Sequence, residues 1–208
     1  MEYKMKYEES TLKMKKSLAD SLKKLACQKP FSKVTVKDII TDCGVNRKTF
    51  YYHFEDIYDL LKWLFAQEAI EIIRQFDLLS ESREAFLFVL DYVSENERFL
   101  YNICHSLGRM ELKKFFYNDF IGIMRSCIDE AEQAQDLCVA EDFKSFLSEF
   151  YAEAIAGVLL LRIDDPQKQD KQQLVQYLSL LINETIPNAL TSAARSGLKE
   201  SRNPDTPE

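Results

Sequence analysis

One short segment of the sequence places groups that recognise nucleic acid on one side of a predicted helix. When residues 47–53 are drawn on a helical wheel, Phe50 and the following Phe54 mark the side to be buried. Arg47 and His53 lie near the boundary of that side, from which their polar tips reach phosphates. Phosphates attract positive charge, and base edges in the major groove need directional donors and apolar partners. The exposed side offers both kinds of group: Lys48, Thr49, Tyr51 and Tyr52.

The residues before this helix carry the start and stop signals of a helix-turn-helix. Thr35 is a favourable N-cap for a helix that Gly44 ends, because glycine tolerates the left-handed conformation of a C-terminal cap. Asn46 caps the next helix after one turn. Lys37 and the backbone N–H groups beside Thr35 form a positive end suited to a phosphate. Two short helices on either side of Gly44 predict a helix-turn-helix that contacts double-stranded DNA.

Basic residues are concentrated in the same part of the chain. Residues 1–54 contain 12 Lys and Arg against 6 Asp and Glu, whereas residues 55–208 contain 15 against 28. The net charge of -7 therefore does not exclude a nucleic-acid partner, because the distribution of charge matters more than its total.

The composition favours an all-α protein. Apolar residues make up 46% of the chain, which is enough to fill a core, and the five Gly and five Pro are too few for a turn-rich β fold. The apolar run Val158–Leu161 is far too short to cross a bilayer, and residues 1–6 lack the apolar core of a signal peptide. We expect a cytoplasmic protein without a membrane partner. The five widely spaced cysteines favour reduced thiols over a disulfide framework.

Apolar spacing and chain breaks divide the sequence into three parts. A first helix is predicted from about Ser10 to Gln28, and residues 10–56 form a three-helix DNA-binding domain. Residues 57–190 form a helical regulatory and dimerisation domain. Residues 191–208 are expected to be a disordered tail, because polar residues predominate there. After a long helix from about residue 57, the second part is predicted to contain helices over residues 83–94, 96–106, 109–134, 141–163 and 170–190.

The segment from Thr35 to Phe54 strongly resembles the DNA-binding signature of the TetR/AcrR family. The shared features are the initial Thr, the Asp38-Ile39 step, the Gly44-Val45 turn and the terminal Phe-Tyr-Tyr-His-Phe. The resemblance covers about residues 10–65 and implies a homodimer that places two recognition helices in a palindromic operator. It also implies DNA contacts by Thr35, Arg47, Lys48, Thr49, Tyr51, Tyr52 and His53.

The sequence departs from the family pattern at the start of the fourth helix. Many members have a lysine there, whereas this chain has Glu55, Asp56 and Ile57. A usual phosphate contact is therefore missing, and the carboxylates are expected to cap the helix instead. With Lys29-Pro30-Phe31 upstream, the pattern resembles the branch that includes activators of dihydroxyacetone kinase operons. The sequence does not tell activation from repression.

Two helices in the second half are predicted to form the dimer interface. The helix over 141–163 carries apolar and small residues at spacings of three and four, and small residues allow a partner helix to approach closely. The helix over 170–190 adds a leucine stripe. By resemblance to the family, two such helices from each subunit form a four-helix interface, although the same stripes can also pack within one chain. The expected interface residues are Phe150, Ala154, Gly157, Leu161, Leu174, Leu178 and Leu181.

Two kinds of partner could switch the regulator: a small molecule or another protein. The helix over 109–134 is apolar on two sides, so it is either simply a central core helix or the lining of a small-molecule pocket with Phe86, Phe88, Tyr92 or Phe99. In the other alternative, this half of the chain is an interaction module for a co-regulator protein. We expect a transcriptional regulator switched by one of the two.

The sequence does not support an enzyme. It contains two histidines, no Gly-rich phosphate loop, and no nucleophile with a base and an orienting partner. Cys104 and His105 are adjacent, so their side chains diverge by about 100° on a helix, and no second pair suggests a metal site. We expect these two residues in the core, and we expect no metal or cofactor.

Overall fold

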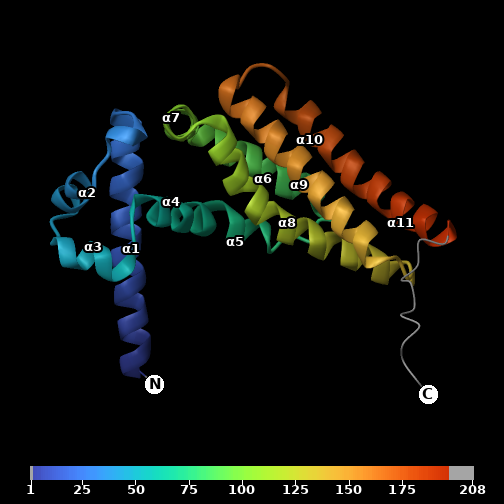
Figure 1. Cartoon of the computed structure of the whole chain (residues 1–208), viewed down its shortest axis with the longest axis horizontal. Coiled ribbons are helices and arrows are strands. Elements are labelled where there is room, and N and C mark those ends of the chain that lie inside the picture. Colours follow the sequence, from blue (N-terminus) through green and yellow to red (C-terminus); the bar gives the residue numbers. More distant parts are fainter. Residues whose placement is uncertain (1, 197–208) are drawn as a thin grey trace. The chain divides into compact units, whose positions relative to one another are not determined.

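The structure is a computed structural model that describes residues 2–196, and these residues form helices joined by short connections (Figure 1). No strand occurs among them, so the predicted all-α class is confirmed. None of the helices in this range has the length and apolar character that crossing a membrane requires.

The first of two compact units contains the helix-turn-helix. It extends to Ile72 and also includes Glu95–Leu112. Its long helix α1 packs against the others, and Leu18 and Leu22 of α1 are fully buried with Phe50 and Leu60. The elements are α1 (Glu2–Gln28), the 3-10 turn η1 (Phe31–Lys33), α2 (Val36–Cys43), α3 (Arg47–His53), α4 (Ile57–Phe65), the π-helical turn η2 (Ala66–Ile70), the start of α5 (Glu71–Ile73) and α7 (Glu97–Leu107).

The predicted boundary after residue 56 does not coincide with the edge of this unit. The apolar face of α4 is buried inside it, and the ring centroids of Phe65 and Phe99 lie 6.0 Å apart. The Asn102 side chain of α7 donates a hydrogen bond of 2.7 Å to the Ala26 carbonyl of α1. Helix α7 completes the core around α1, a long-range arrangement to which local spacing gives no clue.

The second unit is a bundle built around α8 and α9. Among the described residues it comprises Ile73–Ser94 and the chain from Lys113 to Ser196. Helix α9 is buried along one side, including Ala152, Ala156 and Leu160, and it lies beside α10 and α11 in Figure 1. The elements are most of α6 (Ser82–Glu95), most of α8 (Arg109–Ala134), α9 (Glu141–Asp164), α10 (Lys171–Leu180), the π-helical turn η3 (Leu181–Thr185) and α11 (Ile186–Arg195).

A buried lysine ties α8 to α9 in this unit. The Lys144 ammonium lies 2.7 Å from a Glu132 carboxylate oxygen and 3.2 Å from an Asp129 oxygen, and Arg125 bonds Asp129 at 2.9 Å. Burial alone lowers the pKa of Lys144, but hydrogen bonds and charge from Glu132 and Asp129 outweigh burial and raise it. A buried charge is tolerated when it is paired and hydrogen-bonded in this way.

The first residues of the predicted disordered tail are helical. Thr191–Arg195 belong to α11, so the prediction is wrong for these residues. Leu190 and Ala193 are buried there, and the Thr191 hydroxyl donates to the Gln135 side-chain oxygen at 2.7 Å. The apolar spacing Ile186, Leu190, Ala193 gives this segment a face to bury. Residues 197–208 of the predicted tail lie outside the described part of the chain.

Candidate nucleic-acid interface

The N-terminus of α2 is closed by a capping box. The Asp38 backbone N–H donates to the Thr35 hydroxyl oxygen at 3.2 Å, and the Thr35 backbone N–H donates to the Asp38 carboxylate at 2.8 Å. The Lys29 ammonium bonds the same carboxylate at 2.8 Å. This arrangement fixes the start of the helix. It also occupies the Thr35 hydroxyl, although Thr35 and Lys37 both remain exposed.

The Asp38 carboxyl is expected to titrate far below an ordinary aspartate. Hydrogen bonds from Lys29 and then from Thr35 lower its pKa to about 2. The stabilisation that this carboxylate gives to α2 is present above the unfolded-state pKa near 4 and is lost as the pH falls through about 2. An NMR titration of the side-chain carboxyl carbon measures this midpoint. Lys29→Gln should raise the midpoint, whereas Lys33→Gln should leave it in place; a wild-type midpoint near 4 would contradict the contact.

The turn between α2 and α3 depends on one glycine. Gly44 has φ 67° and ψ 31°, the left-handed conformation predicted for this C-cap, and its N–H bonds the carbonyls of Ile40 and Thr41. Residues with a Cβ atom are strained there. The Asn46 side-chain oxygen then accepts from the Thr49 backbone N–H at 2.9 Å and caps α3. Both caps are the ones predicted from the sequence.

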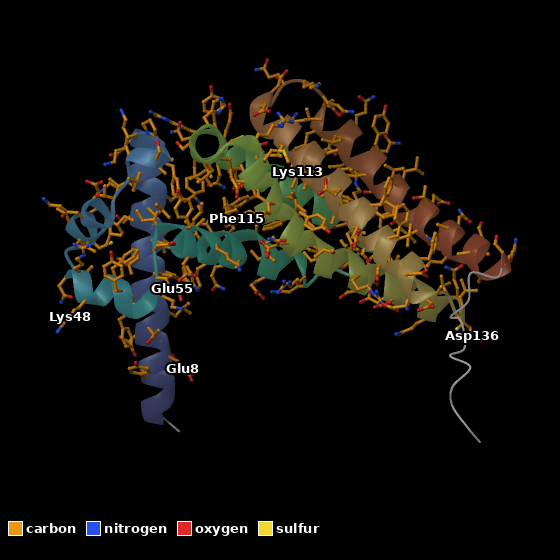
Figure 2. The ribbon with its side chains drawn as sticks, viewed as in Figure 1. Glu8, Lys48, Glu55, Lys113, Phe115 and Asp136 are labelled. Atoms are coloured by element: carbon orange, nitrogen blue, oxygen red, sulfur yellow. The ribbon has the colours of Figure 1, made fainter. Side chains whose placement is uncertain are left out.

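The buried side of α3 is as predicted. Phe50 is fully buried and Phe54 is 3% exposed, so together they anchor the helix. The outward side carries Lys48 together with Tyr51 and Tyr52, which are 48% and 67% exposed. Figure 2 shows Lys48 on the outer side of α3. This surface therefore presents one ammonium and two phenols to a ligand.

Three other residues predicted to contact DNA differ in their exposure and in their contacts. Arg47 is exposed and not at the core boundary; its guanidinium donates to the Tyr51 hydroxyl at 3.2 Å and lies 5.4 Å from the centre of that ring. Thr49 is half-buried, and its hydroxyl donates to Asn46 at 3.2 Å. His53 is half-buried against Tyr52. Burial, and then the charge of Lys15, lower the pKa of His53, so the imidazole is neutral at pH 7.

The acidic start of α4 is used for capping, as predicted. The Asp56 carboxylate accepts from the Asp59 backbone N–H at 2.8 Å, and the Asp59 carboxylate accepts from the Glu55 backbone N–H at 3.1 Å. Negative charge at this helix end is favourable because of the helix dipole.

Sequence reasoning missed the contribution of α1 to this surface. Helix α1 begins at Glu2 and not near Ser10, and its Tyr7 hydroxyl is hydrogen-bonded to the Tyr52 hydroxyl. Lys15 of the same helix lies over the ring of Phe54. The polar composition of residues 1–9 hid the helix, but the spacing of four residues between Tyr7, Thr11 and Lys15 was a usable signal.

The predicted dimer residues divide into two groups. Phe150, Ala154, Leu161 and Leu181 are exposed and Gly157 is half-buried, so the surface of the second unit offers all five to a partner. Leu174 and Leu178 are 6% and 8% exposed and pack within their own chain. Helix α10 has apolar residues on two sides. Leu174 and Leu178 lie on the buried side, whereas Tyr177 and, at the start of η3, Leu181 lie on the exposed side. The leucine stripe therefore belongs mainly to the intrachain core.

The predicted aromatic lining of an effector pocket is only partly assembled. Phe86 and Met124 line an apolar cavity of about 30 Å³ in the second unit, room for roughly one water molecule. Phe99 belongs to the first unit, where it packs on Phe65. A larger hollow of about 310 Å³ has a more polar lining that includes Arg74, Ser126, Cys127 and Glu130.

The adjacent Cys104 and His105 separate as their helical spacing predicts. Cys104 is buried, whereas His105 is exposed and its ring is stacked on the exposed Tyr101 ring, with 3.9 Å between the ring centroids. The expectation of core burial therefore holds for the cysteine and is wrong for the histidine. Within residues 2–196, no three His, Cys, Asp or Glu side chains are grouped to hold a metal ion.

Helical architecture and local sequence together define a regulator class. A family model described as bacterial regulatory proteins, tetR family, matches residues 19–64, and one described as transcriptional regulator C-terminal region matches residues 80–184. The chain belongs to the TetR family of DNA-binding transcriptional regulators.

The chain is similar to two proteins that are named as activators. The HTH-type dhaKLM operon transcriptional activator DhaS of Lactococcus lactis subsp. lactis (strain IL1403) is 26% identical over 153 residues, which are 71% of this chain and 81% of the relative. A solved structure of a dihydroxyacetone kinase operon activator DhaS has the same fold, with a TM-score of 0.61. The match covers 88% of this chain and 97% of that one at 22% identity.

Proposed function

We propose that the chain is a homodimer that binds a palindromic DNA operator through α3 of each subunit. The observation that carries the proposal is the two-sided character of α3: buried Phe50 fixes the helix, and Lys48, Tyr51 and Tyr52 face outward. A capped short helix with this outward face fits a major groove. In the proposal, the phosphate-directed residues Lys37 and Arg47 set the position of the helix, and the phenols and Lys48 read base edges.

An exposed apolar stripe supports the dimer. Phe146 and Phe150 of α9 are 58% and 56% exposed, and Leu161 further along the helix is 42% exposed. Tyr177 and Leu181 are similarly exposed on the neighbouring α10–η3 segment. Large apolar side chains clustered on a surface mark an interaction site. A second copy of the chain covers such a stripe in an isologous two-fold interface.

Regulation of an operon related to dihydroxyacetone kinase is part of the proposal. The similar proteins are named as activators of such operons, which supports activation as the direction of control. We infer that the second unit responds either to a small molecule or to a co-regulator protein, and that the chain itself carries out no catalysis. A ligand that favours one separation of the two α3 helices changes the affinity for the operator.

Binding-site selection tests this proposal. The full-length protein is expected to enrich a palindromic duplex from a random-sequence pool. Its affinity for that duplex should fall steeply between about 50 and 200 mM salt, because each phosphate contact releases counterions. Fluorescence anisotropy at several salt concentrations measures the slope. A pool without an enriched motif, or an affinity independent of salt, would contradict the proposed function.

A further inference from the structure

Three side chains on one face of α1 lie beside the C-terminal end of α3. Tyr7, Thr11 and Lys15 are spaced by four residues, so they lie on one side of the helix. The Tyr7 hydroxyl is hydrogen-bonded to the Tyr52 hydroxyl and also interacts with Thr11. The Lys15 ammonium lies 5.3 Å from the centre of the Phe54 ring. One face of α1 therefore continues the exposed surface of α3.

Tyr7 is hydrogen-bonded to Tyr52, one of the residues on the outward face of α3. Tyr52 is 67% exposed and Tyr7 is 53% exposed, so the bonded pair of phenols lies at the surface. The hydrogen bond to Tyr52 raises the pKa of Tyr7 above its ordinary value, so the phenol stays protonated well beyond neutral pH. A phenol both donates and accepts hydrogen bonds. The bond with Tyr7 thus restricts the rotamer of Tyr52 before any ligand arrives.

The Lys15 contact supplies positive charge where the adjacent segment lacks it. The chain after Phe54 begins with Glu55 and Asp56, and the nearby His53 imidazole is neutral. Lys15 is half-buried; its ammonium lies over the rings of Phe54 and Trp63, at 5.3 and 5.8 Å from their centres. A lysine on a flexible stem above such rings keeps its donors available to a phosphate.

We propose that the Tyr7–Thr11–Lys15 face of α1 is a second DNA-contacting element of this protein. Lys15 contacts a backbone phosphate beside the C-terminal end of α3. Tyr7 is a positioning residue that sets the direction of the Tyr52 hydroxyl. The inference rests on the proposed function, because it extends the same surface, and its partner is the duplex bound by α3.

The charge contribution is tested with a matched pair of lysines. Lys15 and Lys16 are neighbours in α1, but Lys16 lines the open groove between α1 and α2 on another side of the helix. With the duplex selected by the wild-type protein, Lys15→Gln should lower the salt slope by about 0.9 for each phosphate that is no longer neutralised. Lys16→Gln should leave the slope unchanged. Equal slopes for wild type and Lys15→Gln, or equal reductions in both variants, would overturn the phosphate contact.

The positioning role is tested with a matched pair of phenols. Tyr7→Phe removes only the hydroxyl that holds Tyr52, and Tyr101→Phe removes an exposed hydroxyl from α7, which packs at the other end of α1. The ratio of affinities for the selected duplex and a scrambled duplex should fall about threefold to tenfold for each half-site in Tyr7→Phe, the effect of one hydrogen bond. Tyr101→Phe should keep the ratio. An unchanged ratio in Tyr7→Phe would overturn the positioning role.

The outcomes separate this inference from the proposed function. If the wild-type protein selects a palindrome and both α1 variants behave like their controls, the inference fails and the proposed function stands. If the wild type enriches no duplex, both fail. Circular dichroism of all four variants should match the wild type, because the substituted groups are at least partly exposed.

Discussion

Lys48→Ala and Tyr52→Ala should each strongly weaken specific DNA binding while leaving the protein folded and dimeric. Both side chains are exposed on α3, so their truncation removes no core packing. A good contact to a base edge contributes about 1–3 kcal/mol, and a two-fold dimer makes it twice. The affinity for the selected duplex should therefore fall by at least about thirtyfold. Gel shift or fluorescence anisotropy measures this decrease.

The control for this prediction is a lysine of equal charge elsewhere on the surface. Lys168 is exposed in the connection between α9 and α10, and Lys168→Ala should bind the duplex like the wild type. Tyr52→Phe keeps the ring and removes the hydroxyl, so it separates apolar contact from hydrogen bonding. Unchanged affinity in Lys48→Ala and Tyr52→Ala, with normal circular dichroism, would show that α3 is not the recognition helix.

Phe150→Glu combined with Leu181→Glu should convert the protein to a monomer. Both wild-type side chains are exposed on the apolar stripe of the second unit, at 56% and 48%. A carboxylate at the centre of an interface must lose its hydration without gaining a partner, and each substitution occurs twice across a two-fold axis. Sedimentation or light scattering should report half the wild-type mass. Affinity for the palindrome should fall by more than about a hundredfold, because two half-sites are no longer linked.

A matched substitution separates disruption of the interface from added charge. Met110 is 74% exposed on α8 and lies in the first unit, so Met110→Glu adds a carboxylate without touching the stripe. This variant should remain dimeric and bind DNA normally. A wild-type protein that is already monomeric, or a double variant that stays dimeric, would contradict the proposed interface.

The helix-turn-helix was predictable because its signals are local. Thr35, Gly44 and Asn46 perform the cap and turn roles that their types indicate, and the spacing of Phe50 and Phe54 gives the buried side of α3. Each of these features depends on residues within a few positions in the chain. Structure and sequence agree here because no distant packing competes with them.

Features that depend on distant packing were not predictable. Leu174 and Leu178 are as apolar as the exposed Leu181, and only the neighbouring helices decide which side of α10 is covered. Phe99 joins the first unit because α7 returns to pack against α1. The first turns of α1 have a polar sequence, so the apolar spacing did not predict them. They were missed together with the contact between Tyr7 and Tyr52, which joins residues far apart in the chain.

The burial of Phe50 has a consequence for how this regulator changes its target. Phe50 holds α3 from within and the Asn46 cap holds its start, whereas Lys48, Tyr51 and Tyr52 contribute little to the fold. Substitutions at such exposed positions usually change the free energy of unfolding by less than about 0.5 kcal/mol. Evolution or engineering can therefore redirect the protein to a new operator by exchanging outward residues, with its fold and assembly intact.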